Sequence, residues 1–126
     1  MDMKHIVNAY FSAFERKDGE AWVSLFASDG SLGGPAHTPP VMGHAALAEL
    51  FAGIAMLFET IHFDILAVHV HGPFAVAEFD LHTRARNGRT PQAQGMVAFA
   101  ADDAGKLTQV AGFWDPAPVF SQAMAA

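Results

Sequence analysis

The chain of 126 residues has no cysteine and few basic side chains. The lack of cysteine excludes disulfides, thiolate metal sites and a cysteine nucleophile. Only seven Lys and Arg stand against 13 Asp and Glu, the formal net charge is −6, and the basic residues form no cluster. Nucleic acids and anionic membrane surfaces are bound by concentrated positive charge, so we expect neither as a partner.

Long apolar runs and targeting patterns are missing as well. No run approaches the roughly 20 residues that a membrane-spanning helix needs, and the segment Met1–His5 lacks the basic-then-apolar pattern of a secretion signal. We therefore expect a soluble, cytoplasmic protein. Phosphate-loop, dinucleotide, serine-nucleophile and zincin patterns are also absent, so the sequence predicts no cofactor.

Apolar side chains dominate what is present. Hydrophobic residues make up 52% of the chain, and it has 11 Phe but one Tyr and two Trp. Phe fills space without needing a hydrogen-bond partner, which suits a core, an apolar cavity or a surface buried between subunits. The length is that of one domain, and we see no linker or repeat that would divide residues 1–126.

Helical spacing of apolar residues predicts three helices in the first half of the chain. The first begins after Asp2 and stops at Lys17–Gly19, and the second begins at Asp18 and runs through Phe26 to end at residues 28–30. Residues 30–43 hold four Gly and three Pro and predict an irregular connection with a short strand at 31–32. The third helix is predicted from residue 44 to about 56.

From Ile61 onward the period of the pattern changes to two, which indicates strands. We predict four long strands, at 61–71, 74–86, 92–101 and 106–114, with a bulge near Leu66–Ala67 and a hairpin turn at Asn87–Gly88. Three helices followed by a meander of strands predict an α+β fold. In that fold the N-terminal helices cover one face of a curved antiparallel sheet of four long strands plus a short one.

Several short motifs, in this order and spacing, resemble a known family. The first half resembles ketosteroid isomerases, and the segment from Gly105 to Pro116 resembles the last hairpin of SnoaL-like proteins. The motifs are Tyr10, Asp18-Gly19-Glu20-Ala21, Ser28-Asp29-Gly30, Pro39-Pro40-Val41-Met42-Gly43, Gly105-Lys106-Leu107 and Phe113-Trp114-Asp115-Pro116. Together they resemble the NTF2-like (cystatin-like) superfamily over nearly the whole chain. The resemblance implies a deep pocket between sheet and helices, and a homodimer formed through the open face of the sheet.

The same resemblance matches the pocket wall but not the acid–base groups of a steroid isomerase. Tyr10 matches the isomerases' oxyanion Tyr, and Trp114 matches a Trp of their pocket. The Asp that shuttles the proton in those enzymes falls on Gly34, and the protonated oxyanion Asp falls on Gly95 or Val97. Two supporting Tyr fall on Phe26 and Phe51. A standard steroid isomerase is therefore not expected.

Other residues remain candidates for proton transfer. In the strand at 74–86, one row holds Asp80 and His82 and the opposite row is apolar; alternation alone leaves open which row faces the pocket. His37 lies just past Gly34, where it either acts as a base or is a solvated loop side chain. Asp115 either terminates a strand or acts as an acid.

A metal site was the least favoured alternative. His69 and His71, with His82 on the next strand, have the spacing of ligands, but no carboxylate lies at a matching position, and we predict no metal.

The resemblance implies a SnoaL-like pocket protein with a small, apolar or partly polar ligand. The alternative is an isomerase, cyclase or hydratase in which Tyr10 polarises an oxygen and His37, Asp80, His82 or Asp115 moves the proton. The predicted catalytic residues are Tyr10, Asp80, His82 and Asp115. The predicted pocket-lining residues are Tyr10, Phe14, Phe26, Gly34, His37, Phe51, Val110, Gly112 and Trp114.

Overall fold

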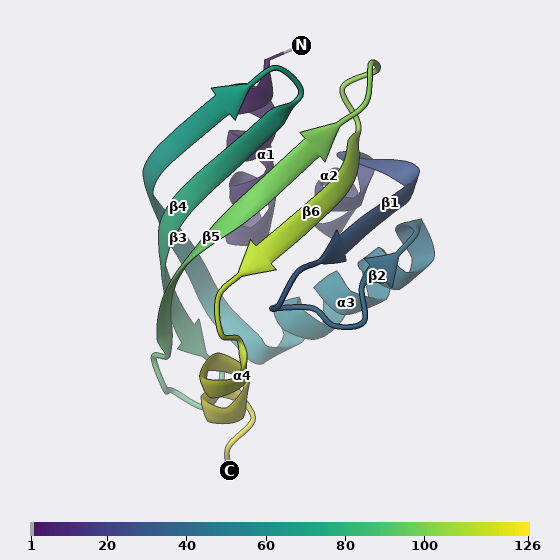
Figure 1. Ribbon diagram of the computed structural model, residues 1–126. Coiled ribbons are helices and arrows are strands. Elements are labelled where there is room, and N and C mark those ends of the chain that lie inside the picture. Colours follow the sequence, from purple (N-terminus) through teal and green to yellow (C-terminus); the bar gives the residue numbers. More distant parts are fainter. Residues whose placement is uncertain (1) are drawn as a thin grey trace.

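The computed structural model describes residues 2–126 and shows helices packed on one face of a six-stranded sheet (Figure 1). The helices are α1 (Met3–Arg16), α2 (Gly19–Ser24), α3 (His44–Leu57) and α4 (Ala117–Ala123). The strands are β1 (Phe26–Gly33), β2 (Val41–Met42), β3 (Phe58–His71), β4 (Phe74–Ala85), β5 (Gln92–Ala101) and β6 (Leu107–Phe113). Their order in the sheet is β2-β1-β6-β5-β4-β3, and only the β1–β6 pair is parallel. The predicted α+β class, with N-terminal helices on the sheet, is confirmed; the sheet has six strands rather than the five predicted, and it is mostly rather than wholly antiparallel.

Local chemistry explains where the first two helices begin. The Asp2 carboxylate accepts a hydrogen bond from the His5 amide at the start of α1, and the Asp18 carboxylate accepts one from the Ala21 amide at the start of α2. Between them Lys17 adopts a left-handed backbone conformation (φ 54°), and its N–H bonds the last carbonyls of α1. The chain therefore turns sharply, and the two helices pack against the same side of the sheet.

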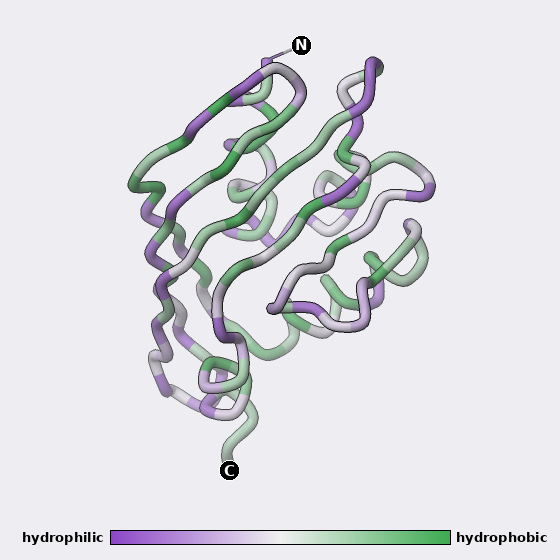
Figure 2. Tube along the Cα trace, viewed as in Figure 1, coloured by the Kyte–Doolittle hydropathy of each residue, from purple (hydrophilic) through white to green (hydrophobic). Residues whose placement is uncertain are grey.

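The sheet has an inner face towards the helices and an outer face that no helix covers (Figure 1). On β4 the apolar row that includes Phe79 and Leu81 is buried on the inner face, whereas Asp80 and His82 point outward. Hydropathy accordingly alternates along β3 and β4 (Figure 2). The register shift between Ile65 and Ala67 confirms the predicted bulge. The structure thus decides the question that alternation left open: the apolar row faces inward.

The free edge of the sheet is covered by side chains of α1. β3 is an edge strand, so half of its backbone groups lack a neighbouring strand. The Glu15 carboxylate accepts a hydrogen bond from the Phe63 amide at 2.9 Å, and the Lys17 ammonium donates to the Glu59 carbonyl at 2.6 Å. These contacts fix α1 over β3 and so position its inner stripe over the sheet.

Two local predictions were wrong. Residues 26–30 were predicted as the end of the second helix, but that helix ends at Ser24 and Phe26 opens the eight-residue strand β1. The segment pairs in parallel with β6 and antiparallel with β2, so long-range pairing overrides its helical spacing. The prediction also stopped at Pro116, whereas the structure continues into α4.

Candidate functional site

A cavity of about 70 Å³ lies between the inner face of the sheet, α1, α3 and α4. Eight of the 17 residues that line it are aromatic, and none is an Asp or Glu. A single water needs roughly 10–15 Å³ measured in this way, so the space admits a small molecule rather than one water. The lining residues are Tyr10, Phe11, Phe14, Leu32, His37, Ile54, Phe58, Ile61, Phe63, Phe79, Leu81, Thr83, Val97, Gly112, Trp114, Val119 and Phe120.

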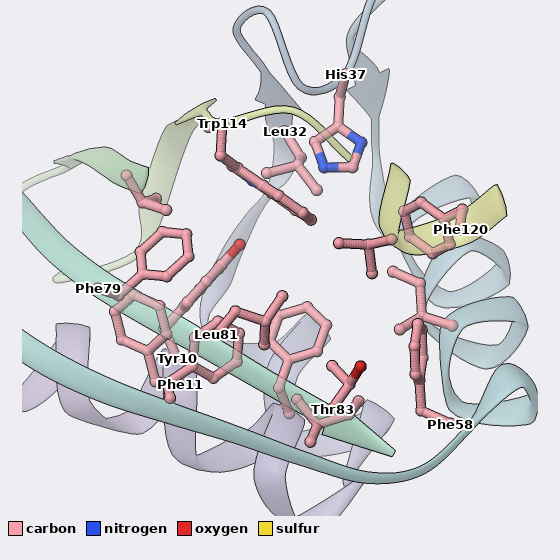
Figure 3. Close-up of a pocket in the computed structure, with 17 residues that line it drawn as sticks. Tyr10, Phe11, Leu32, His37, Phe58, Phe79, Leu81, Thr83, Trp114 and Phe120 are labelled. Atoms are coloured by element: carbon pink, nitrogen blue, oxygen red, sulfur yellow. The ribbon is translucent and has the colours of Figure 1, made fainter. Parts of the chain in front are cut away.

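Tyr10 supplies a polar group deep in the cavity. It lies on the inner stripe of α1 with 5% of its surface exposed, and its ring packs edge-on against Phe11 and Phe99. Figure 3 shows its hydroxyl directed into the open space towards Trp114. Burial raises the pKa of Tyr10 far above its ordinary value; the nearby indole N–H of Trp22 opposes part of that rise without reaching hydrogen-bond geometry. Tyr10 is therefore a neutral hydrogen-bond donor at physiological pH.

His37 enters the same space from the loop after β1 (Figure 3). Its loop is tied down by the Ala36 amide, which donates to the Gly112 carbonyl at 3.1 Å, and by the His37 amide, which donates to the Gly34 carbonyl at 3.2 Å. Burial lowers the pKa of His37 below 6.5. The imidazole is thus neutral at pH 7 and able to accept a proton. Thr83, by contrast, already donates its hydroxyl to the Pro91 carbonyl at 2.7 Å.

Close backbone packing excludes side chains at two positions where steroid isomerases would carry their acids. Gly34 has φ +81°, and a Cβ there would lie 2.6 Å from the Gly112 carbonyl oxygen. A Cβ on Gly95 would lie 2.5 Å from the Cβ of Trp114, whose side chain covers Gly95 on the inner face. Since real Cβ contacts are essentially never so short, neither position has room for a carboxylate. Val97 is the other position that the oxyanion Asp could match, and it lines the cavity with an apolar side chain.

Nine residues are predicted to line the pocket, and five of them do line this cavity: Tyr10, Phe14, His37, Gly112 and Trp114. Phe26, Gly34, Phe51 and Val110 are not among its lining residues. The rings of Phe26 and Phe51 pack instead on the buried indole of Trp22, behind Tyr10. They support the wall of the cavity from outside.

The other residues predicted for proton transfer lie away from the cavity. Asp80 and His82 point from β4 to the outer face, where the Nε2 atom of His82 lies 3.0 Å from a carboxylate oxygen of Asp64. One carboxylate oxygen of Asp80 is buried there without a hydrogen-bond partner. Asp115 is exposed and accepts a hydrogen bond from the Ala117 amide at 3.1 Å, where α4 begins. None of these three side chains reaches a ligand in the cavity.

Two further features bear on the class of site. Within residues 2–126, no three His, Asp or Glu side chains converge in a way that could hold a metal ion, and His69 instead pairs with Glu78 at 3.1 Å. In the same part of the chain, no helix has the length and apolar character needed to cross a membrane.

Sequence reasoning missed the contribution of α4. Val119 and Phe120 close one end of the cavity, and the Phe120 ring lies 6.1 Å from that of Phe58 at the start of β3. A signal was present: Asp115-Pro116 is a helix-start pattern, and Val119, Phe120 and Ala123 then follow at helical spacing.

Known structures share the overall fold of this chain. A hypothetical protein with a ketosteroid isomerase-like fold from Catenulispora acidiphila, solved in complex with trimethylamine, has a TM-score of 0.81 at 17% identity, and the match covers 96% of this chain and 93% of that one. A putative polyketide cyclase from Xanthomonas campestris pv. campestris has a TM-score of 0.81 at 23% identity, with 95% of each chain covered. A putative SnoaL-like polyketide cyclase from Shewanella denitrificans gives 0.80 at 15%, with 94% of each covered. At these identities the likeness establishes the fold.

A family model extends the comparison to sequence. A search of curated proteins gave no significant match. The model of the SnoaL-like domain, however, matches residues 7–110, which is most of the chain and includes most of α1, the strands β1 to β5 and the His37 loop. The chain therefore belongs to the SnoaL-like domain family, with the ketosteroid isomerase-like fold of the NTF2-like superfamily.

Proposed function

We propose that the chain binds a small, uncharged and mostly apolar molecule in the cavity between sheet and helices. The observation that carries this proposal is the lining: aromatic and aliphatic side chains surround the space, and the two titratable groups that reach it, the Tyr10 hydroxyl and the His37 imidazole, are both neutral. Burying apolar surface gains roughly 25 cal/mol per Å². A charged group brought to the same place would lose its hydration without meeting a partner of opposite charge.

The polar groups define how such a ligand would lie. Tyr10 donates a hydrogen bond, so it favours an acceptor such as a carbonyl or ether oxygen at the deep end. The Trp114 indole and the Phe79 ring, 6.3 Å apart and nearly perpendicular, form adjacent walls that suit a flat ring. A compact molecule with a ring and one acceptor oxygen fits this arrangement.

Binding can be tested with three probes of similar size: acetophenone, benzoate and benzylammonium. We expect acetophenone to perturb the indole NMR signal of Trp114, and the two charged probes to leave it unchanged up to millimolar concentration. Tyr10→Phe keeps the shape of the cavity and should weaken acetophenone binding by about 0.5–1.5 kcal/mol, the net value of one hydrogen bond. Equal binding of the charged probes would refute the proposal.

A second candidate is catalysis of proton transfer, because His37 is neutral and lines the cavity together with Tyr10. In this function His37 takes a proton from a carbon next to a carbonyl, Tyr10 hydrogen-bonds the enolate oxygen, and the proton returns to another carbon. The structural likeness to putative polyketide cyclases supports a substrate of this enolisable kind. Because Asp80, His82 and Asp115 lie outside the cavity, His37 carries the proton in this candidate function.

Catalysis is tested by following exchange of the methyl hydrogens of acetophenone in D₂O. We expect exchange above the buffer rate with the unaltered chain and none above it with His37→Gln, which keeps a polar side chain but cannot act as the base. If both proteins match the buffer rate, the binding function alone remains.

We further propose that two copies associate through the outer face of the sheet, in the cytoplasm. An apolar patch crosses that face on β4, β5 and β6, and its largest members are substantially exposed: Phe74 (55%), Met96 (45%) and Phe113 (46%). The register places Met96 directly beside Phe113. Exposed aromatic and Met side chains in one place are typical of protein interfaces.

A further inference from the structure

The short helix α4 closes one end of the cavity with a single apolar side. Val119 (2% exposed), Phe120 and Ala123 face the cavity and the core, while the remaining side chains of the helix face outward. Figure 3 shows Phe120 on α4 and Phe58 at the same end of the open space, with Phe79 across from them. Displacement of this one helix would therefore open the cavity.

Tertiary contacts hold α4 in place, because seven residues are too few for a helix to be stable in isolation. On its inner side, Val119 and Ala123 are buried in the core. Its C-terminal end is held by one side chain: the Asn87 amide nitrogen donates to the carbonyls of Gln122 at 2.8 Å, Ala125 at 3.0 Å and Ala123 at 3.2 Å. Asn87 thus joins this end of α4 to the turn between β4 and β5.

Asn87 belongs to a turn that also holds a second cavity-lining helix. It lies between β4 and β5, and the neighbouring Arg86 guanidinium donates to the carbonyls of Met56 at 2.9 Å and Ala55 at 3.4 Å, at the end of α3. The side-chain oxygen Oδ1 of Asn87 accepts a hydrogen bond from the Arg89 backbone amide at 3.0 Å, which keeps the turn closed. One rigid turn therefore fixes the ends of two helices, through separate side chains.

From these contacts we propose that α4 is a hinged lid, latched by the Asn87 amide, and that Phe120 on this lid limits the length of ligand that the cavity accepts. The proposal rests on the binding function proposed above. The lid pivots near Asp115-Pro116, where the chain leaves β6, and its closed position depends on the Asn87 hydrogen bonds. Ligands longer than the closed cavity then meet the Phe120 ring.

The latch can be tested without any ligand, by hydrogen exchange on the full chain. Asn87→Asp keeps the oxygen that accepts from the Arg89 amide but loses the N–H donors to α4. We expect the amides of Phe120 in α4 and of Met124, directly after it, to exchange about tenfold faster, as for the loss of about one net hydrogen bond. The Thr83 and Ala101 amides in the sheet should be unchanged. Arg89→Ala, in the same turn, is the matched control and should leave α4 unaffected.

The length limit is tested with phenyl alkyl ketones from acetophenone to octanophenone. Each methylene added to the ketone should tighten binding about fourfold until the alkyl tail reaches Phe120, and the affinity should fall for longer ketones. Phe120→Ala should move this maximum to a longer ketone, and it tests the lid even if Asn87→Asp folds poorly.

The possible failures can be told apart. If no ketone binds any variant, the proposed binding function is wrong, and the exchange data still decide the latch. If ketones bind but α4 exchange in Asn87→Asp matches the unaltered chain, the latch is wrong. If the ketone that binds most tightly is the same for Phe120→Ala as for the unaltered chain, Phe120 does not limit ligand length.

Discussion

Three glycines and one tryptophan determine the shape of the polar end of the cavity. Gly34 and Gly112 let the His37 loop lie directly on β6, and Gly95 leaves the space that the Trp114 side chain occupies. The acids of a steroid isomerase cannot be restored at Gly34 or Gly95 by substitution alone. Tyr10 and His37 are accordingly the titratable residues that line this cavity.

The tight packing at Gly95 predicts a large effect of a single methyl group. Gly95→Ala should lower the free energy of unfolding by about 1–3 kcal/mol. The new Cβ would meet the Cβ of Trp114 and the backbone carbonyl of Phe113, and neither can move aside without shifting the strand. The matched control is Gly53→Ala on α3, where a Cβ meets nothing within 4 Å; that change should raise stability by about 0.5–1 kcal/mol. Urea unfolding measures both, and a neutral Gly95→Ala would contradict the packing described.

His37 makes stability depend on pH in a defined direction. Its pKa is lowered by burial, so in acid the unfolded chain takes up this proton before the folded chain does. The contribution of His37 to folding is therefore undiminished above pH 6.5 and falls as pH drops from 6.5 towards the folded pKa. NMR titration of the His37 ring should give a midpoint below 6.5. His37→Gln should flatten that part of the stability profile, and a midpoint above 6.5 would disprove the burial of the ring.

At the scale of elements, the edge strand β3 carries a titrating group with the opposite behaviour. His62 lies between two carboxylates, with Nε2 2.8 Å from an Asp64 oxygen and Nδ1 2.8 Å from a Glu15 oxygen. Its hydrogen bond to Asp64 is the main cause of its raised pKa. The stabilising contribution is then present below pH 6.5 and is lost as pH rises through the folded pKa.

Asp64→Asn tests this pair, since the amide keeps the shape of the carboxylate but removes its charge. We expect the NMR titration midpoint of His62 to fall towards its ordinary value. Asp80→Asn on the neighbouring strand is the control and should leave the midpoint in place, because His62 bonds Glu15 and Asp64. An unchanged midpoint in Asp64→Asn would assign the shift to Glu15 instead. The effect on stability should be small because His62 is exposed.

The elements that the sequence predicted are those with a strong local pattern. α1 and α3 show helical spacing, β4 and β5 alternate cleanly, and Leu66–Ala67 carries the phase slip of a bulge, so each was predicted nearly to its ends. Of β1 only residues 31–32 were predicted, because most of Phe26–Gly33 becomes a strand only by pairing with β6, some 80 residues later. Such long-range pairing leaves no local signature.

The candidate site was predicted unevenly for the same reason. Tyr10 and Trp114 could be placed by resemblance, and His37 by its position beside Gly34. Phe58 and Phe120 line the cavity because β3 starts early and α4 folds back over its end, and both facts depend on tertiary contacts. The outward direction of Asp80 and His82 was undetermined because β4 can bury either row until its neighbours are fixed.

At the scale of the whole molecule, the two faces of the sheet differ in what covers them. The inner face meets helices and the cavity, whereas the outer face bears both the apolar patch and a charged region that includes Asp64, Asp80 and His82. A second copy that covers the outer face would bury Phe74, Met96 and Phe113 and would give the buried, unpaired oxygen of Asp80 a possible donor.

Association through this face predicts that one charge in the patch separates the copies. Met96→Glu places a carboxylate between Phe113 and the Glu78 carboxylate, where burial would cost its hydration and bring two like charges together. Sedimentation velocity at micromolar concentration should show a dimer for the unaltered chain and a monomer for Met96→Glu. Met56→Glu changes another exposed Met side chain (75% exposed, against 45% for Met96), on α3 at the opposite side, and should stay dimeric. If the unaltered chain sediments as a monomer, the outer face is not a self-association surface; if both variants stay dimeric, the copies meet elsewhere.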